Sequence, residues 1–330
     1  MKKNKVFLGL KIILTFGLLA YLFKRVDIHT LAESFHKIHW GWYVGAYLSI
    51  WISMVTLVWR WQSLVRAEGK RVDFKILFPY HMIGYFFGNF LPRLIGGDGV
   101  KAYLMSKLGF SKTRSFAILV FARAIGAMAL FFISIVSLII SRTLIEKTGI
   151  PSSLVWIWSL LVLAGAVVAY LALTSNVAAR FLRRHENILT RSLIVLHDFR
   201  SHLYLLLGAF SISVFHQLIV FLRYFFVSKS LGIEVDYASM AVICSLVFAL
   251  TMIPITVNGV GIRENGFVYL LGILGVNGED AIVFSLLNYG LMILMGMAGG
   301  AFYLWSLRVE PIKAVPVRES ISVKKKTVLS

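Results

Sequence analysis

The sequence predicts an all-α polytopic membrane protein, with about six transmembrane helices and two re-entrant helical hairpins arranged as an inverted repeat. Three observations predict this class. The 330-residue chain is 58% hydrophobic, with a mean hydropathy of +0.81, which is too apolar for a soluble domain of this length. Apolar runs near the ~20 residues that a bilayer requires recur along the chain. Two short segments rich in Gly and Pro, both inside apolar sequence, match each other.

Six apolar runs are long enough to cross a membrane. The first follows Met-Lys-Lys-Asn-Lys and ends at Lys24-Arg25 without a small-x-small cleavage site. We therefore expect a retained helix here and not a signal peptide. The six predicted crossings are Val6–Phe23, Tyr43–Val65, Arg114–Ser141, Ser153–Thr174, His202–Ser228 and Asp280–Leu307.

Two further apolar regions are interrupted. The first break follows Ile76–Leu91 and the second follows Ala238–Ile253, and an apolar arm resumes after each break. Each arm is too short to cross comfortably, and irregular backbone at membrane depth survives only inside protein or along a cavity. We therefore expect two re-entrant hairpins. Their predicted tip residues are Pro92, Gly96, Gly97, Gly99, Pro254, Gly259 and Gly261.

The two breaks share one motif. Pro92–Lys101 and Pro254–Arg263 both fit P-x-x-x-[GN]-G-x-G-[VI]-[KR]. Aligning the two motifs also superposes the predicted helices before the hairpins and those after them. Three crossings separate the hairpins, and an odd number makes the units inverted. The predicted organisation is one transmembrane domain over 1–310, with units at about 43–141 and 202–307 joined by 142–201, and a basic cytoplasmic tail over 311–330.

The net charge of +19 lies mainly in the short segments between apolar runs. With both termini cytoplasmic, 22 basic residues fall on the inner side, Arg60 among them, and 6 fall on the outer side. This asymmetry follows the positive-inside rule. It predicts a multi-pass protein of the cell membrane, and it argues against nucleic acid as a partner.

Some charges remain at membrane depth, where an ionisable group costs at least ~2.5–3.5 kcal/mol and needs a partner. The cations are Lys11, Arg93, Lys101, Arg123, Arg223 and Arg263, and the acids are Asp98 and Glu264. The excess of cations predicts an anionic ligand such as a phosphate-bearing lipid headgroup. The candidate substrate-binding residues are Asp98, Lys101, Arg123, Asn258, Arg263 and Glu264.

Two interpretations of the hairpin charges stay open. Lys101 and Arg263 follow Gly-rich helix starts, whose free N–H groups suit an anion. Alternatively, Asp98–Lys101 and Arg263–Glu264 are internal ion pairs that fasten the tips. Arg223 lies near the outer end of its predicted span, where an arginine can snorkel to the interface. The polar residues Asn89, His216, Gln217 and Asn288 fit either a cavity or interhelical hydrogen bonds.

The sequence contains no pattern typical of an enzyme. Walker, G-x-S-x-G and dinucleotide motifs are missing, and we expect no catalytic residue and no cofactor. His36 and His39 are helically spaced, but no third ligand lies nearby in the sequence, so no metal site is expected. Cys244 is the only cysteine, which excludes an internal disulfide.

The motif residues resemble the lysylphosphatidylglycerol synthase transmembrane region family, a family of flippase-like membrane proteins. The resemblance rests on Asn89–Tyr103 (NFLPRLIGGDGVKAY), on Arg123, and on Pro254–Glu264 (PITVNGVGIRE). It extends over most of the chain. Lys101 stands where the family commonly has Arg, so the charge is kept while bidentate phosphate contact is weakened.

The resemblance implies lipid translocation. Family members include the membrane half of aminoacyl-phosphatidylglycerol synthases and stand-alone proteins tied to the movement of lipids or polyprenyl-linked sugars. We expect a stand-alone member without the aminoacyl-transferase domain. It would move an anionic phospholipid, an aminoacyl-phospholipid or a polyprenyl-phosphate-linked glycolipid. Two alternatives stay open: a membrane-embedded lipid-phosphate transferase, and a non-transporting membrane partner of a separate lipid or glycan synthase.

Overall fold

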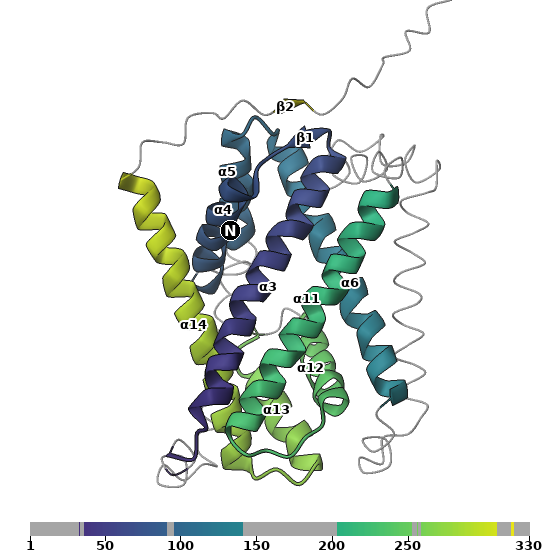
Figure 1. The fold of residues 1–330 in the computed structure, drawn as a ribbon, viewed down its shortest axis with the longest axis vertical. Helices are drawn as coiled ribbons and strands as arrows, with labels where there is room; N and C mark the ends of the chain where they lie inside the picture. Colours follow the sequence, from purple (N-terminus) through teal and green to yellow (C-terminus); the bar gives the residue numbers. More distant parts are fainter. Residues whose placement is uncertain are drawn as a thin grey trace, which may run out of the picture.

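The computed structural model describes residues 36–90, 96–140, 203–252 and 259–308, together with 33, 256 and 318–319. Within these residues the chain forms eight helices and two very short strands (Figure 1). The elements are α3 (Trp40–Ala67), β1 (Lys70–Arg71), α4 (Phe74–Phe90), α5 (Gly97–Lys107), α6 (Lys112–Ile140), α11 (Leu203–Ser230), α12 (Tyr237–Met252), α13 (Ile262–Ile273), α14 (Gly278–Arg308) and β2 (Arg318–Glu319).

Four of the described helices are long and apolar enough to cross a membrane: α3, α6, α11 and α14. Their bounds agree with four of the six predicted crossings to within three residues at each end. The other two predicted crossings, Val6–Phe23 and Ser153–Thr174, lie outside the described residues. The chain is therefore an all-helical membrane protein over its described length, apart from the two-residue strands.

The long helices α3 and α11 lie antiparallel along each other (Figure 1). Three hydrogen bonds fix their register. The His39 N–H donates to Ser230 O at 2.8 Å, Thr56 Oγ1 lies 3.0 Å from His216 Nδ1, and Arg60 Nη1 lies 3.3 Å from Ser213 Oγ. The start of each helix thus faces the end of the other. His216 makes an interhelical hydrogen bond, which was one of its two predicted roles.

Each interrupted region folds into a pair of short helices. The pair α4–α5 lies in the upper half of Figure 1 and the pair α12–α13 in the lower half. These helices have 17, 11, 16 and 12 residues. At a rise of ~1.5 Å per residue, all four are shorter than a ~30 Å hydrocarbon core.

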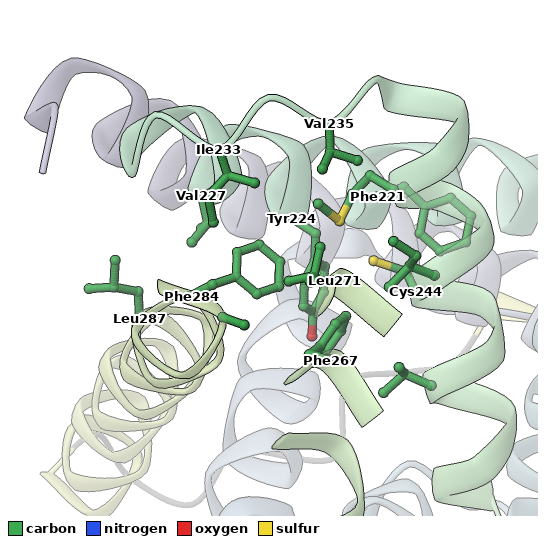
Figure 2. Close-up of a cluster of buried hydrophobic side chains, with 14 of the residues drawn as sticks. Phe221, Tyr224, Val227, Ile233, Val235, Cys244, Phe267, Leu271, Phe284 and Leu287 are labelled. Carbon is green, nitrogen blue, oxygen red and sulfur yellow. The ribbon is translucent and has the colours of Figure 1, made fainter. Parts of the chain in front are cut away.

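Two large apolar clusters form around the two helix pairs. The first packs α3, α4, α5 and α6 through side chains such as Trp61, Tyr80 and Met105. The second packs α11, α12, α13 and α14, and Figure 2 shows Tyr224 and Phe267 at its centre. Their rings stack with centroids 5.2 Å apart. Aromatic pairs of this kind add to the burial of apolar surface. Each helix pair is thus held by its own core.

Glycines allow the helices around the first pair to approach closely. A Cβ at Gly97 would lie 2.7 Å from the carbonyl oxygen of Gly84 and 3.1 Å from Gly88 Cα. On α14, a Cβ at Gly299 would overlap the backbone of Met82. Small residues on α14 therefore allow close packing against α4.

The connections at the ends of the bundle are fixed by polar contacts. Asp236 caps the start of α12, because its carboxylate accepts hydrogen bonds from the N–H and the hydroxyl of Ser239. Burial acts to raise the pKa of Asp236, but the Ser239 hydrogen bonds outweigh it and the net pKa is lowered. At the opposite end β1 pairs with β2, with Lys70 opposite Glu319.

Two glycines in the first turn of α5, Gly97 and Gly99, should differ in their tolerance of a methyl group. We expect Gly97→Ala to destabilise the protein by about 1–3 kcal/mol, since the methyl group would collide with the backbone of α4. Gly99→Ala is the matched control, because a Cβ there meets nothing within 4 Å and alanine favours a helix. Thermal unfolding of the two purified variants checks this. Equal melting temperatures would contradict the close approach of α4 and α5.

Candidate functional site

The first hairpin carries an acid at the start of its second arm. Asp98 is the second residue of α5, and its Oδ2 lies 2.6 Å from Nη2 of Arg123 on α6. The Arg123 side chain is 55% exposed and that of Asp98 is 24% exposed. The pair therefore lies on an open side of the bundle. It fastens the second arm of the hairpin to the helix that follows it.

Lys101, one turn further along α5, packs against α4. A Cβ at Gly84 would lie 2.5 Å from both Cγ and Cε of Lys101, so glycine at 84 makes room for the methylene chain. The Lys101 ammonium interacts favourably with the charge of Asp98 and unfavourably with those of Arg123 and Arg60. Of the described acidic residues, only Asp98 offsets the positive charge of Lys101, Arg123 and Arg60.

Two buried groups from α3 and α4 lie near Lys101. Arg60 reaches Ser213 through Nη1, and His81 lies beside the Trp61 indole with ring centroids 6.1 Å apart. His81 is within range of the charges of both Lys101 and Arg60. Among the described residues, Arg60 Nε, Trp61 Nε1 and His81 Nε2 are buried and have no hydrogen-bond partner. Such groups are costly unless something accepts from them or donates to them.

The second hairpin turns on two glycines in the left-handed region. The φ angle is +76° at Gly259 and +88° at Gly261, values that side chains disfavour. Gly261 is the N-cap of α13, and its N–H donates to Oε2 of Glu264 at 2.5 Å. The other carboxylate oxygen of Glu264 lies 3.7 Å from Arg263 Nε. Glu264 therefore caps its own helix and partly balances Arg263.

Met292 on α14 contacts residues from both hairpins. Its backbone carbonyl accepts a hydrogen bond from Asn89 Nδ2 at 3.0 Å, and its sulfur lies 3.1 Å from Arg263 Nη1. One turn earlier, the Tyr289 ring lies 5.6 Å from the Arg263 guanidinium carbon. The end of α4 and the start of α13 thus meet on one turn of α14.

Tyr85 extends this contact toward α11. Its hydroxyl is hydrogen-bonded to the side chain of Asn89 and interacts with the charges of Arg223 and Arg263. Arg223 is only 8% exposed and its guanidinium lies 4.5 Å from the centroid of the Tyr224 ring. Arg223 therefore does not snorkel to the interface, as its position near the end of the predicted span suggested. Aromatic rings and neighbouring helices hold it inside the bundle.

The predicted binding residues fall into two groups joined through α4 and α14. Asp98, Lys101 and Arg123 surround the start of α5, and Arg263 with Glu264 forms the start of α13. Of the two ion pairs considered from sequence, Arg263–Glu264 is present, while the ion pair of Asp98 is with Arg123 and not with Lys101. Asn258, Pro92 and Pro254 lie outside the described residues.

The predicted tip glycines take different roles. Gly96 is the N-cap of α5, and Gly97 is buried against α4, whereas Gly99 is exposed. Gly259 and Gly261 form the second turn.

Three side chains of this interior were not among the candidate binding residues predicted from sequence: the arginines Arg60 and Arg223, and His81. Arg60 was assigned to the inner segments, but α3 continues well beyond it, to Ala67. A signal for Arg60 and Arg223 does exist in the sequence, because they lie 32 and 31 residues before Pro92 and Pro254, the first residues of the two hairpin motifs.

Away from the two ends of the bundle, the described residues include the five cations Arg60, Lys101, Arg123, Arg223 and Arg263, against the acids Asp98 and Glu264. Both acids already have partners. An interior of this kind favours an anion, since the excess positive charge otherwise lacks a counter-charge in a medium of low dielectric.

The fold and the interior charges together define a helical membrane protein with a cationic interior. The chain belongs to the family described as the lysylphosphatidylglycerol synthase TM region, whose model matches residues 6–300. This confirms the family that the hairpin motifs indicate, and it links the chain to proteins that handle lipids. A comparison with curated proteins gives no match.

Two substitutions should distinguish the role of Glu264 as a helix cap from its role as the ion-pair partner of Arg263. Glu264→Gln keeps an oxygen that can accept from the Gly261 N–H, whereas Glu264→Ala leaves that buried donor without its partner. We expect the alanine variant to lose about 1–3 kcal/mol of stability, and the glutamine variant to lose less. Thermal unfolding of both variants measures the difference. Equal losses would mean that charge balance with Arg263, and not the cap, is the main role.

Proposed function

We propose that the protein is a lipid flippase. It moves an anionic phospholipid, an aminoacyl-phospholipid or a polyprenyl-phosphate-linked glycolipid between the leaflets of the cell membrane. The phosphate of the headgroup binds the interior cations while the acyl or prenyl chains remain in the bilayer. Its partners are therefore the membrane lipids, and a separate lipid or glycan synthase is a candidate partner that would supply or use the transported lipid.

One observation carries this proposal: an excess of cations lies where the two hairpins meet. Asn89 and Arg263 converge on Met292, with Arg223 and Tyr85 beside them. A phosphate offers several acceptor oxygens and a negative charge, which matches the donors of these side chains. The family to which the chain belongs supports a lipid as the carrier of that phosphate.

The arrangement of the acids favours transport over transferase chemistry. A transferase acting on a lipid phosphate would use Asp98 or Glu264 as a general base. Asp98 accepts from Arg123, and Glu264 accepts from the Gly261 N–H and faces Arg263. Both carboxylates are thus engaged in contacts that hold the hairpins in place, whereas a general base needs an oxygen directed at the proton that it removes. We therefore propose a transporter and not an enzyme.

We further propose that the helix pairs α4–α5 and α12–α13 are re-entrant hairpins in an inverted repeat. Their arms are too short to span the bilayer, and they lie at opposite ends of the bundle in Figure 1. Each follows one long helix and precedes another. Together with the two predicted crossings outside the described residues, this gives six crossings and two cytoplasmic termini. Alternating access to a site between the hairpins follows from such symmetry.

Cysteine labelling tests this topology. On a Cys244→Ser background, a cysteine replacing Ser111, in the loop after α5, should react only from the cytoplasmic side. A cysteine replacing Asn277, in the loop after α13, should react only from outside. The reason is that the two hairpins enter from opposite faces. Labelling of both positions from the same side would contradict the inverted arrangement.

Reconstitution into liposomes tests the transport activity. The full chain should accelerate the exchange of labelled phosphatidylglycerol, or of another lipid in a panel, between leaflets. Lys101→Ala and Arg263→Ala should abolish exchange at normal abundance, because each removes a phosphate partner. Arg263→Ala also removes the ion-pair partner of Glu264, at a cost on the order of 3–5 kcal/mol for a buried pair. Lys101→Arg keeps the charge and should retain exchange.

The combined replacement of Lys324, Lys325 and Lys326 is the matched control for lost positive charge. These tail lysines should affect only surface attraction to anionic lipid. A new lipid species in the liposomes would support the transferase alternative. Normal exchange by Lys101→Ala would mean that the hairpin cations serve structure alone.

A further inference from the structure

The helices that precede the two hairpins, α3 and α11, each carry an arginine at a similar distance before the hairpin motif. Aligning the two motifs, Pro92 with Pro254, places Arg60 at residue 222, one residue before Arg223. The two arginines thus occupy places in their helices that agree to within one residue. Lys101 and Arg263 likewise occupy matching positions in the two hairpin motifs.

This correspondence pairs one arginine with one hairpin cation in each half. In the first half, Arg60 and Lys101 interact through their charges, and His81 of α4 is within range of both. In the second half, Arg223 and Arg263 both act on Tyr85 and Tyr224. The two halves have therefore kept the same pair of positive charges, although most of their other residues differ.

The arginine of each pair, and His81 beside the first pair, have a buried nitrogen atom without a hydrogen-bond partner in the described part of the chain. Arg223 is 8% exposed and His81 is 6% exposed. Among the described residues, Arg60 Nε, His81 Nε2 and Arg223 Nε have no hydrogen-bond partner. Arginine cannot lose its charge, so a buried guanidinium with a free N–H and no described carboxylate beside it is complementary to an anion. The same feature occurs in both halves.

The two pairs are separated along the bundle. The Arg60–Ser213 bond sets Arg60 level with residue 213 of α11, almost three helical turns before Arg223. At ~1.5 Å per residue, the two arginines are about 15 Å apart along the helix axis. The two arginines therefore enter the bundle at different levels, almost three turns apart.

A polar stripe on α4 joins the two pairs. His81, Tyr85 and Asn89 follow one another at i, i+4 spacing and so share one face of the helix. His81 lies by the first pair, and Tyr85 with Asn89 lies by the second.

We propose that the protein has two equivalent anion-binding sites, one formed by Arg60 and Lys101 and the other by Arg223 and Arg263, and that a phosphate group passes between them along the polar face of α4. The proposal rests on the proposed lipid transport for the identity of the moving group. It adds two binding residues, Arg60 and Arg223, and a stoichiometry of two anions per chain. Transport would then be a transfer between two sites and not the reorientation of one.

Binding to the full chain in detergent tests this without requiring transport. The probes are dioctanoyl phosphatidylglycerol and, separately, inorganic phosphate, with bound molecules counted by native mass spectrometry. The wild type should bind two molecules. Arg60→Gln and Arg223→Gln should each bind one, with affinity at the lost site about tenfold or more weaker, and the double variant should bind none.

Matched variants control for folding and charge. Arg66→Gln removes an exposed arginine from the same helix as Arg60 and should still bind two molecules. Arg60→Lys and Arg223→Lys keep the charge and should restore the second molecule. A single bound molecule in the wild type that either glutamine variant removes would overturn the proposal in favour of one shared site. Two bound molecules in both glutamine variants would overturn it equally.

The two probes separate this proposal from the transport proposal. Two molecules of inorganic phosphate, with no binding of the lipid and no exchange in liposomes, would support the two sites and contradict the flippase. Lipid exchange by a chain that binds a single anion would support the flippase and contradict the two sites.

Discussion

The packing of α14 against α4 is the contact on which the arrangement of the interior depends. Glycine at 299 lets the helices approach until side chains and backbone interlock, and Asn89 then reaches the carbonyl of Met292. Since α14 also receives Arg263 on that turn, one helix contact holds parts of both hairpins. Dispersion forces and hydrogen bonds drive such association in lipid, where the hydrophobic effect does not distinguish neighbours.

This contact holds the charged residues of the two helix pairs in fixed positions. A short helix that begins inside the bundle has backbone N–H groups without a helical partner, and these groups and the nearby charges must be satisfied there. Glu264 satisfies the start of α13 and Asp98 ties α5 to α6, so the acids are used for structure. Arg123 and Arg263 share these acids, whereas no ion pair with a described carboxylate is seen for Arg60, Lys101 or Arg223. A protein that needed only to stabilise these turns would have little reason to keep Arg60 and Arg223 as well, since each adds a buried charge.

The sequence predicted the helices better than the site. Apolar runs and Gly/Pro breaks define α3 to α6 and α11 to α14 to within a few residues, because hydropathy decides where a helix can lie in a bilayer. It could not predict the partner of Asp98, since the choice between Lys101 and Arg123 depends on how α5 packs against α6. The sequence analysis also counted Arg60 with the inner-side charges and favoured the interface for Arg223, because distance from the end of a span does not say which way a side chain points.

Because Lys101 packs over Gly84, substitutions at these two positions should be correlated among homologous chains. The methylene chain of the lysine occupies the space that a side chain at 84 would need. A substitution at either position changes the shape required at the other, so homologous chains should vary at the two sites jointly. Where a guanidinium replaces the ammonium, its planar and wider head should be accompanied by changes along the facing stretch of α4. The residue at position 84 and its neighbours on α4 would then covary with the choice of Lys or Arg at position 101.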